Sequence, residues 1–64
     1  MKILAERTTK FNQFIQLTLR DNGKYRVKMW TEDDTDWDWE EGSYDEMLKF
    51  YERAESIDDF NEFV

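Results

Sequence analysis

The residues whose types and spacing could support chemistry are concentrated in one stretch, residues 32–41. It holds seven carboxylates and two tryptophans in the order EDDTDWDWEE. Such a set could hold a divalent cation, supply a catalytic acid–base pair, or present negative charge to a basic partner. Each of these chemistries makes a different demand on the rest of the chain.

A calcium loop is the first candidate, because Asp34, Asp36 and Asp38 have the alternating spacing of its first three ligands. The loop needs glycine at its sixth position, where Trp39 stands, and a bidentate glutamate at its twelfth, where Asp45 stands. The pattern therefore fails at two essential positions. We expect no metal site and no cofactor.

The composition and length of the chain exclude most kinds of catalytic site. The chain has no Cys and no His, which removes the common nucleophile–base pairs and the usual proton shuttle near neutral pH. Two carboxylates are enough for glycoside hydrolysis. However, 64 residues can hardly form a cleft of roughly 300 Å³ or more as well as a core. We expect a protein that is not an enzyme.

The third candidate is electrostatic mimicry of nucleic acid. Alternate residues of a strand lie about 6.6 Å apart on one face, and one DNA strand carries a charge roughly every 3.4 Å. Carboxylates on one face of a strand would form such a row, with neighbouring acids supplying a second row, while Trp37 and Trp39 anchor the strand from behind. The expected partner-binding residues are Asp33, Asp34, Asp36, Asp38, Glu40 and Glu41.

A simpler interpretation is that these acids form a solvated face that keeps a small protein soluble. The density of the run favours mimicry, because repulsion within it destabilises the fold and solubility needs only a modest net charge.

Charge is divided unevenly along the chain, whose formal net charge is −7. Residues 1–31 hold seven Lys and Arg against two acids, a net of +5, whereas residues 32–64 hold fourteen acids against two bases, a net of −12. A protein that binds nucleic acid directly is usually basic overall. We therefore expect no direct nucleic-acid binding, and a basic, nucleic-acid-binding host protein as the partner.

A β-hairpin around Gly23 is predicted to join strands within residues 11–20 and 25–31, after a first strand over residues 1–7. A two-residue Asn-Gly turn would place apolar residues opposite charges, because a one-residue slip moves every side chain to the other face. A three-residue loop with Gly23 in the left-handed conformation, a type I turn with a glycine bulge, avoids this. It pairs Leu19 with Tyr25, Leu17 with Val27 and Ile15 with Met29.

The other face of this hairpin is basic and aromatic, with Arg20, Lys24, Arg26, Lys28, Phe14 and Trp30. Such patches can bind single-stranded nucleic acid. The alternative is that these cations pair with the acidic stretch across the sheet.

The second half is predicted to continue as a strand and then a helix. Strict alternation over residues 35–40 favours a strand antiparallel to residues 25–31. Ser43 and Glu46 fit a capping box, and the helix should run to about Glu55. Its apolar stripe is Tyr44, Met47, Leu48, Tyr51 and Ala54, with Phe50 at the border. A second Ser-x-x-acid pattern at Ser56 predicts a short helix over residues 57–63.

These elements predict one compact domain, residues 1–64, of α+β class. It would have a three- to four-stranded antiparallel sheet with one main helix packed on it and a short C-terminal helix. Residues 1–7 contain an apolar run of three residues, shorter than a signal peptide needs, and no run approaches the roughly 20 residues of a membrane span. We expect a soluble, cytoplasmic protein without membrane contact, as a monomer or homodimer.

In size, acidity and hairpin-then-helix layout, the chain resembles the small acidic inhibitor proteins of phages and mobile elements, many of which are DNA mimics. The resemblance is compositional and rests on no motif. It implies a non-enzymatic inhibitor that blocks the nucleic-acid-binding site of a host nuclease, repair or defence protein. The alternative is a protein–protein interaction module that regulates or bridges a complex without DNA mimicry.

Overall fold

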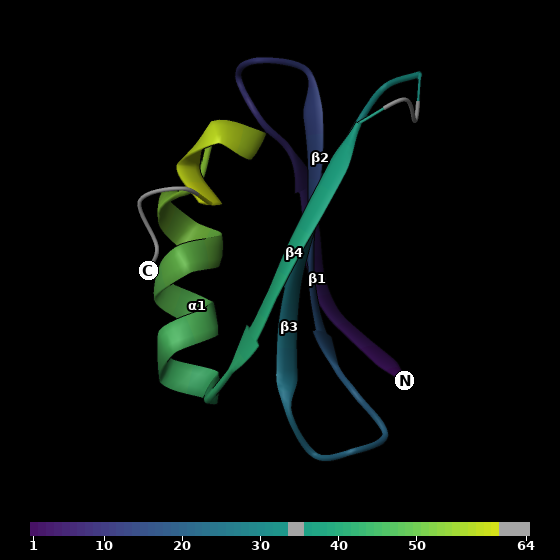
Figure 1. Ribbon diagram of the computed structural model, residues 1–64, viewed down its shortest axis with the longest axis vertical. Helices are drawn as coiled ribbons and strands as arrows, with labels where there is room; N and C mark the ends of the chain where they lie inside the picture. The colour runs from purple at the N-terminus through teal and green to yellow at the C-terminus, as the bar shows by residue number, and fades with distance from the viewer. Residues whose placement is uncertain (34–35, 61–64) are drawn as a thin grey trace.

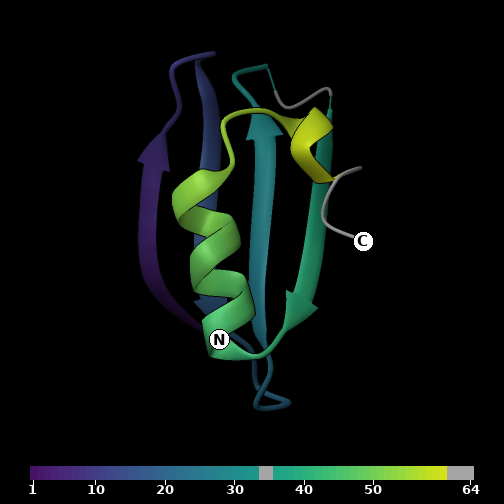
Figure 2. The same cartoon turned by 90° about the vertical axis from the view of Figure 1, so that its left-hand side faces the viewer.

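The computed structural model has a four-stranded antiparallel sheet with one helix packed on it. It describes residues 1–33 and 36–60. The strands are β1 (Lys2–Thr8), β2 (Gln13–Leu19), β3 (Tyr25–Thr31) and β4 (Trp37–Gly42). Helix α1 (Tyr44–Arg53) and the 3-10 turn η1 (Ile57–Asp59) follow. The strands lie in chain order, and α1 and η1 pack against the same face of the sheet (Figures 1 and 2). The predicted α+β class is confirmed.

The β2–β3 hairpin has the predicted register. Gly23 adopts a φ of 82°, which glycine reaches without the steric cost that a Cβ would add. The Gly23 N–H donates to the Arg20 carbonyl at 3.0 Å, and the Arg20 N–H donates to the Lys24 carbonyl at 2.8 Å. The resulting apolar pairs are Leu19–Tyr25, Leu17–Val27 and Ile15–Met29.

Antiparallel pairing aligns the strands into cross-strand rows, and the rows on the helix side build the core. One such row is Arg7, Ile15, Met29 and Asp38; the next is Ala5, Leu17, Val27 and Glu40. The central members of both rows are buried under α1. The complete core cluster is Ile15, Leu17, Val27, Met29, Met47, Phe50, Tyr51, Ala54 and Phe60.

Helix α1 begins at the predicted capping box. The Ser43 Oγ accepts from the Glu46 N–H at 3.3 Å, while the Glu46 Oε1 accepts from the Ser43 N–H at 3.4 Å. The helix ends at Arg53, two residues before the predicted end at Glu55. Among the described residues no helix is long and apolar enough to cross a membrane.

The buried stripe of α1 is rotated from the predicted one. Phe50, expected at the border, is 1% exposed, whereas Tyr44, expected inside, is 45% exposed. Phe60, which follows η1, packs its ring edge-on against Phe50, with centroids 4.7 Å apart. This contact with a residue ten positions away in sequence contributes to the burial of Phe50 and is not visible in the helical periodicity.

Arg7 on β1 joins the edge of the sheet to the end of α1. Its Nη2 donates to the Tyr51 carbonyl at 2.7 Å and to the Ala54 carbonyl at 2.8 Å, and its Nη1 lies 3.6 Å from a Glu55 carboxylate oxygen. The last carbonyls of a helix lack partners within the helix. Arg7 supplies two of these missing donors and provides a positive charge at the negative end of the helix dipole.

Two predicted boundaries are wrong. β2 starts at Gln13, and Phe11, expected on the core face of a strand over residues 11–20, is 58% exposed in the β1–β2 turn. Asn12 next to it has a φ of 60°, a conformation that interrupts a strand. The predicted terminal helix is represented by η1 alone, and residues 61–63 of that prediction lie outside the described residues.

Asp59 closes the connection between α1 and η1. One of its carboxylate oxygens accepts from the Glu55 N–H at 2.7 Å and from the Ser56 N–H at 3.1 Å. These two backbone hydrogen bonds hold the pKa of Asp59 below its usual value, because they favour the charged carboxylate.

Candidate functional site

The sheet face opposite α1 gathers the aromatic and cationic side chains of the central strands. Its first cross-strand row is Thr8, Phe14, Trp30 and Trp37; the second is Glu6, Gln16, Lys28 and Trp39; the third includes Thr18, Arg26 and Glu41. We call six of these residues the cation–aromatic face: Phe14, Arg26, Lys28, Trp30, Trp37 and Trp39.

Aromatic residues occupy adjacent positions on three strands of this face. The Phe14 and Trp30 ring centroids lie 5.7 Å apart in a tilted pair, and Trp30 lies directly opposite Trp37. Trp37 is 56% exposed and Trp39 is 39% exposed. A small protein therefore presents a large part of two indoles to solvent on a single face.

The two cations on this face are held in different ways. Arg26 lies 4.0 Å above the Trp39 ring centroid and donates from Nε and Nη2 to one Glu41 oxygen at 3.0 and 2.8 Å. The Lys28 Nζ lies 5.5 Å from the Trp30 centroid and 5.6 Å from the Trp37 centroid. No carboxylate of residues 1–33 or 36–60 forms a salt bridge with Lys28. The same Glu41 oxygen lies 3.9 Å from the Arg20 Nε, so one carboxylate serves two arginines, whereas Lys28 has no carboxylate partner among the described residues.

A hollow of about 310 Å³ lies beside the Phe14–Trp30 pair. Its other lining residues are Glu6, Arg7 and Thr8 of β1 and Ile15 of β2. The Glu6 Oε2 accepts from the Gln16 Nε2 at 3.0 Å, so this carboxylate is partly satisfied. The hollow therefore combines two aromatic walls with an edge on β1 that carries one acid and one base.

Trp37 and Trp39 lie behind the carboxylates of β4, as expected, but they do not anchor the strand against the core. The strand itself forms and alternates as expected, but Trp37 pairs with Trp30, and Trp39 pairs with Lys28. Both indoles therefore join the uncovered face. The helix-side positions of β4 are taken by Asp38 and Glu40 at the edge of the sheet, where α1 leaves Asp38 exposed and Glu40 half-buried.

The predicted acidic row is present in part. Asp38 and Glu40 share the helix side of β4, and Asp36 precedes the strand with the same alternation. None of these three forms a salt bridge with any described residue. Charged side chains on an edge strand also discourage pairing with a second chain, so the row has a structural use of its own.

Two other predicted binding residues lie away from this row. Glu41 is on the opposite face, paired with Arg26. Asp33 lies in the β3–β4 turn, where one of its oxygens accepts from the Thr31 hydroxyl at 2.9 Å. The structure therefore does not bring Glu41 and Asp33 into one row with Asp38 and Glu40, and Asp34 lies outside the described residues.

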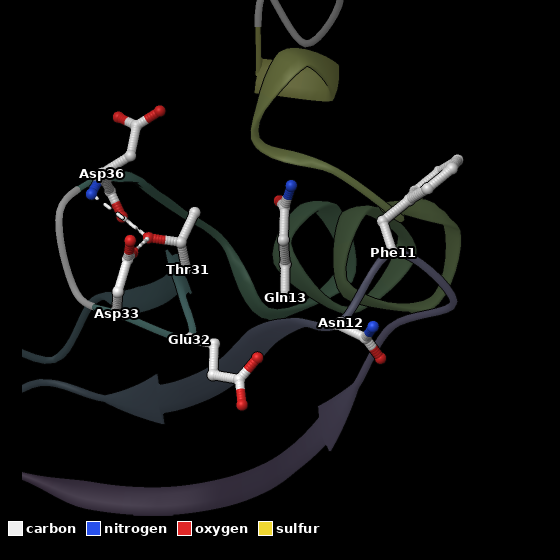
Figure 3. Close-up of a pocket in the computed structure, with 7 residues that line it drawn as sticks. All are labelled: Phe11, Asn12, Gln13, Thr31, Glu32, Asp33 and Asp36. Atoms are coloured by element: carbon white, nitrogen blue, oxygen red, sulfur yellow. Dashed lines mark hydrogen bonds between the residues drawn. The ribbon is translucent and has the colours of Figure 1, made fainter.

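A larger hollow of about 700 Å³ lies where the β1–β2 and β3–β4 turns approach each other (Figure 3). Its lining residues are Phe11, Asn12, Gln13, Thr31, Glu32, Asp33 and Asp36. Several polar groups here are engaged within the protein: Thr31 donates to Asp33, and the Gln13 Oε1 accepts from the Ile57 N–H at 2.8 Å. Among the described residues no group of three or more acidic, His or Cys side chains could hold a metal ion.

The signal that would have placed Trp37 and Trp39 correctly is the length of the β3–β4 loop. The Thr31 N–H donates to the Asp36 carbonyl at 3.0 Å, so four residues separate these positions. A loop one residue shorter or longer would turn both indoles towards α1.

Comparison with known proteins does not indicate a family or a function for the chain, because no family model, curated protein or solved structure matches it.

Proposed function

We propose that the protein is a non-enzymatic protein–protein interaction module whose partner docks on the cation–aromatic face. The observation that carries this proposal is the exposure of Trp37 and Trp39, 56% and 39%, beside Trp30 on an uncovered sheet face. Tryptophan and arginine are among the side chains that dominate interface energetics. Contiguous exposed apolar patches on a small monomer commonly mark binding sites.

A purely structural role for the indoles accounts for only part of this arrangement. Cation–π contacts at exposed sites contribute about 0.5–1 kcal/mol each, and Arg26 on Trp39 has the geometry to do so. Trp37, however, contacts its cation at 5.6 Å and keeps more than half of its surface in water. A partner that covers this surface gains from burying an indole, whereas the isolated fold does not.

Affinity capture with matched variants tests the proposal. Tagged wild-type protein, Trp37→Ala and Phe11→Ala would be incubated with a lysate of the cells that express the protein, and retained proteins identified by mass spectrometry. Phe11 is a suitable control because it is 58% exposed but lies in the β1–β2 turn. We expect a partner retained by wild type and Phe11→Ala and lost with Trp37→Ala. Equal retention by all three would remove this face as the docking surface.

Acidic mimicry is a second candidate, favoured by Asp36, Asp38 and Glu40, whose carboxylates form no salt bridge with the described residues. In this case the protein inhibits a basic host nuclease, repair or defence protein by occupying its nucleic-acid site. Changing Asp36 and Asp38 together to Asn should then abolish capture while Trp37→Ala retains it. The opposite pattern would support docking on the cation–aromatic face.

A further inference from the structure

We infer that the partner presents an acidic segment with one apolar or aromatic anchor, and that Lys28 receives a carboxylate of that segment. This inference rests on the proposed function, because it names the chemistry of the partner that docks on the cation–aromatic face. Two features of the face lead to it: a cation, Lys28, that forms no salt bridge with the described residues, and a hollow lined by the neighbouring Trp30.

Lys28 supplies the anion-binding group. Its ammonium lies within 5.6 Å of two indole centroids, Trp30 and Trp37, and forms no salt bridge with the described residues. A docking partner that covers these indoles also removes water from the ammonium. Burying a charge without a counter-ion is costly, so a complementary partner must bring a negative group to this position.

The hollow beside Phe14 and Trp30 supplies the anchor site. Its volume of about 310 Å³ is at the lower end of ligand pockets, which suits a single side chain. Glu6 and Arg7 both line the hollow, so neither sign of charge is favoured there, and the aromatic walls of Phe14 and Trp30 favour an apolar or aromatic side chain. Because Trp30 borders both the hollow and the Lys28 ammonium, the anchor and the carboxylate are neighbours in the partner.

The spacing between the two sites can be stated. Lys28 and Trp30 are alternate residues of β3 on one face, a separation of about 6.6 Å. An extended peptide places its own alternate side chains at the same interval. The partner segment is therefore expected to carry its acid and its anchor two residues apart.

The net charge of −7 does not oppose an acidic partner at physiological ionic strength. The Debye length is about 8 Å at 0.15 M salt, so an approaching partner responds mainly to charges near the surface that it contacts. Exposed carboxylates of α1, such as Glu52, are separated from this face by the sheet (Figure 1), so salt weakens their effect there. The local charge includes Lys28, which forms no salt bridge with the described residues.

A single-stranded nucleic acid fits this face less well. Bases bind such sheets by stacking on free aromatic rings, but Arg26 already covers Trp39 at 4.0 Å. Two donors of Arg26 and the Nε of Arg20 also share the Glu41 carboxylate, which lowers the positive charge that this face offers to successive phosphates. A short acidic segment needs only one such cation.

Selection from a random peptide-display library tests the inference without a known partner. The library would be panned on wild-type protein at 0.15 M salt after counter-selection on Trp37→Ala. We expect enriched peptides with Asp or Glu two residues from an aromatic or aliphatic residue. Enrichment of basic or uncharged peptides, or of none, would overturn the inference, as would tighter binding of a 15-mer of thymidylate than of the best peptide.

Matched lysine variants locate the carboxylate. Lys28→Gln should weaken the best acidic peptide about tenfold, since a hydrogen bond to a charged group is lost, whereas Lys24→Gln in the hairpin turn should leave binding unchanged. Equal effects of both changes would overturn the assignment to Lys28. A failure of the proposed function can be told apart from a failure of this inference. If the proposed function is wrong, Trp37→Ala captures the same proteins from the lysate as wild type, whatever peptides are selected.

Discussion

Trp30 and Trp37 lie directly opposite each other on β3 and β4, on the face of the sheet that α1 does not cover. Because side chains alternate along a strand, this one pair also decides the positions of their neighbours. Trp39 follows Trp37 onto the uncovered face, and Asp38 is directed to the helix side. The cation–aromatic face is therefore a consequence of the β3–β4 register.

The exposure of Trp37 predicts that its removal has little effect on folding. Trp37→Ala should lower the free energy of unfolding by less than about 1 kcal/mol, because the side chain is 56% exposed and loses mainly a surface cation–π contact. Met29→Ala, at a fully buried position, should cost about 2–5 kcal/mol. Urea denaturation measures both, and a similar cost for the two variants would place Trp37 in the core.

The hairpin register predicts a requirement for glycine at position 23. Gly23→Val should cost more than about 1 kcal/mol, because a β-branched residue resists a positive φ. No atom lies within 4 Å of the position that a Cβ would take, so the cost is conformational and not a clash. Gly23→Asn should be better tolerated, since asparagine adopts this conformation more readily. Equal unfolding midpoints for wild type and Gly23→Val would contradict this account of the turn.

The parts of the fold that sequence reasoning predicted depend on local parity. Ile15, Leu17 and Leu19 match Tyr25, Val27 and Met29 across a short loop, so only one register buries all six on one face. The faces of β4 were not accessible in the same way, because both tryptophans and carboxylates alternate and either set could face α1. Adding or removing one residue in the β3–β4 loop would exchange the two faces of β4. The acidic residues around the loop do not indicate its length.

The end of α1 should depend on the shape of the Arg7 side chain. Arg7→Lys keeps the charge but cannot reproduce donation to both the Tyr51 and Ala54 carbonyls, so we expect a loss of about 1–3 kcal/mol. Arg53→Lys on the exposed side of α1 is the control and should change stability by less than about 0.5 kcal/mol. If both lysine variants unfold at the wild-type urea concentration, Arg7 does not stabilise the helix end.

The same contact shows a limit of sequence reasoning. Arg7 and Ala54 are 47 positions apart, and no periodicity links an arginine on an edge strand to a helix C-terminus. Phe11 and Phe50 were misplaced for a related reason, since the β1–β2 turn and the return of Phe60 are tertiary features. Capping at Ser43, by contrast, involves residues three positions apart and was predicted correctly.

The lowered pKa of Asp59 leads us to expect that the stability of the fold depends on pH in the acidic range. Its pKa is lowered in the folded protein by hydrogen bonds from the Glu55 and Ser56 backbone. A depressed pKa contributes stability that is present above the unfolded pKa of about 3.9 and is lost as the pH falls through the folded pKa.

The variant Asp59→Asn removes this titration. It should be less stable than wild type at pH 7, and the difference should shrink as the pH falls from about 5 towards 2. Thermal unfolding monitored by circular dichroism across this range measures the effect. A stability difference that stays constant with pH would show that the Asp59 charge does not contribute.

Oxidative footprinting of the complex tests most directly the central claim that the partner covers the cation–aromatic face. Hydroxyl-radical oxidation of each aromatic residue would be quantified by mass spectrometry for the free protein and for the protein bound to its captured partner. We predict that oxidation of Trp37 and Trp39 falls several-fold on binding while that of Phe11 and Tyr44 is unchanged. Unchanged oxidation of Trp37 and Trp39 in the complex would contradict the claim.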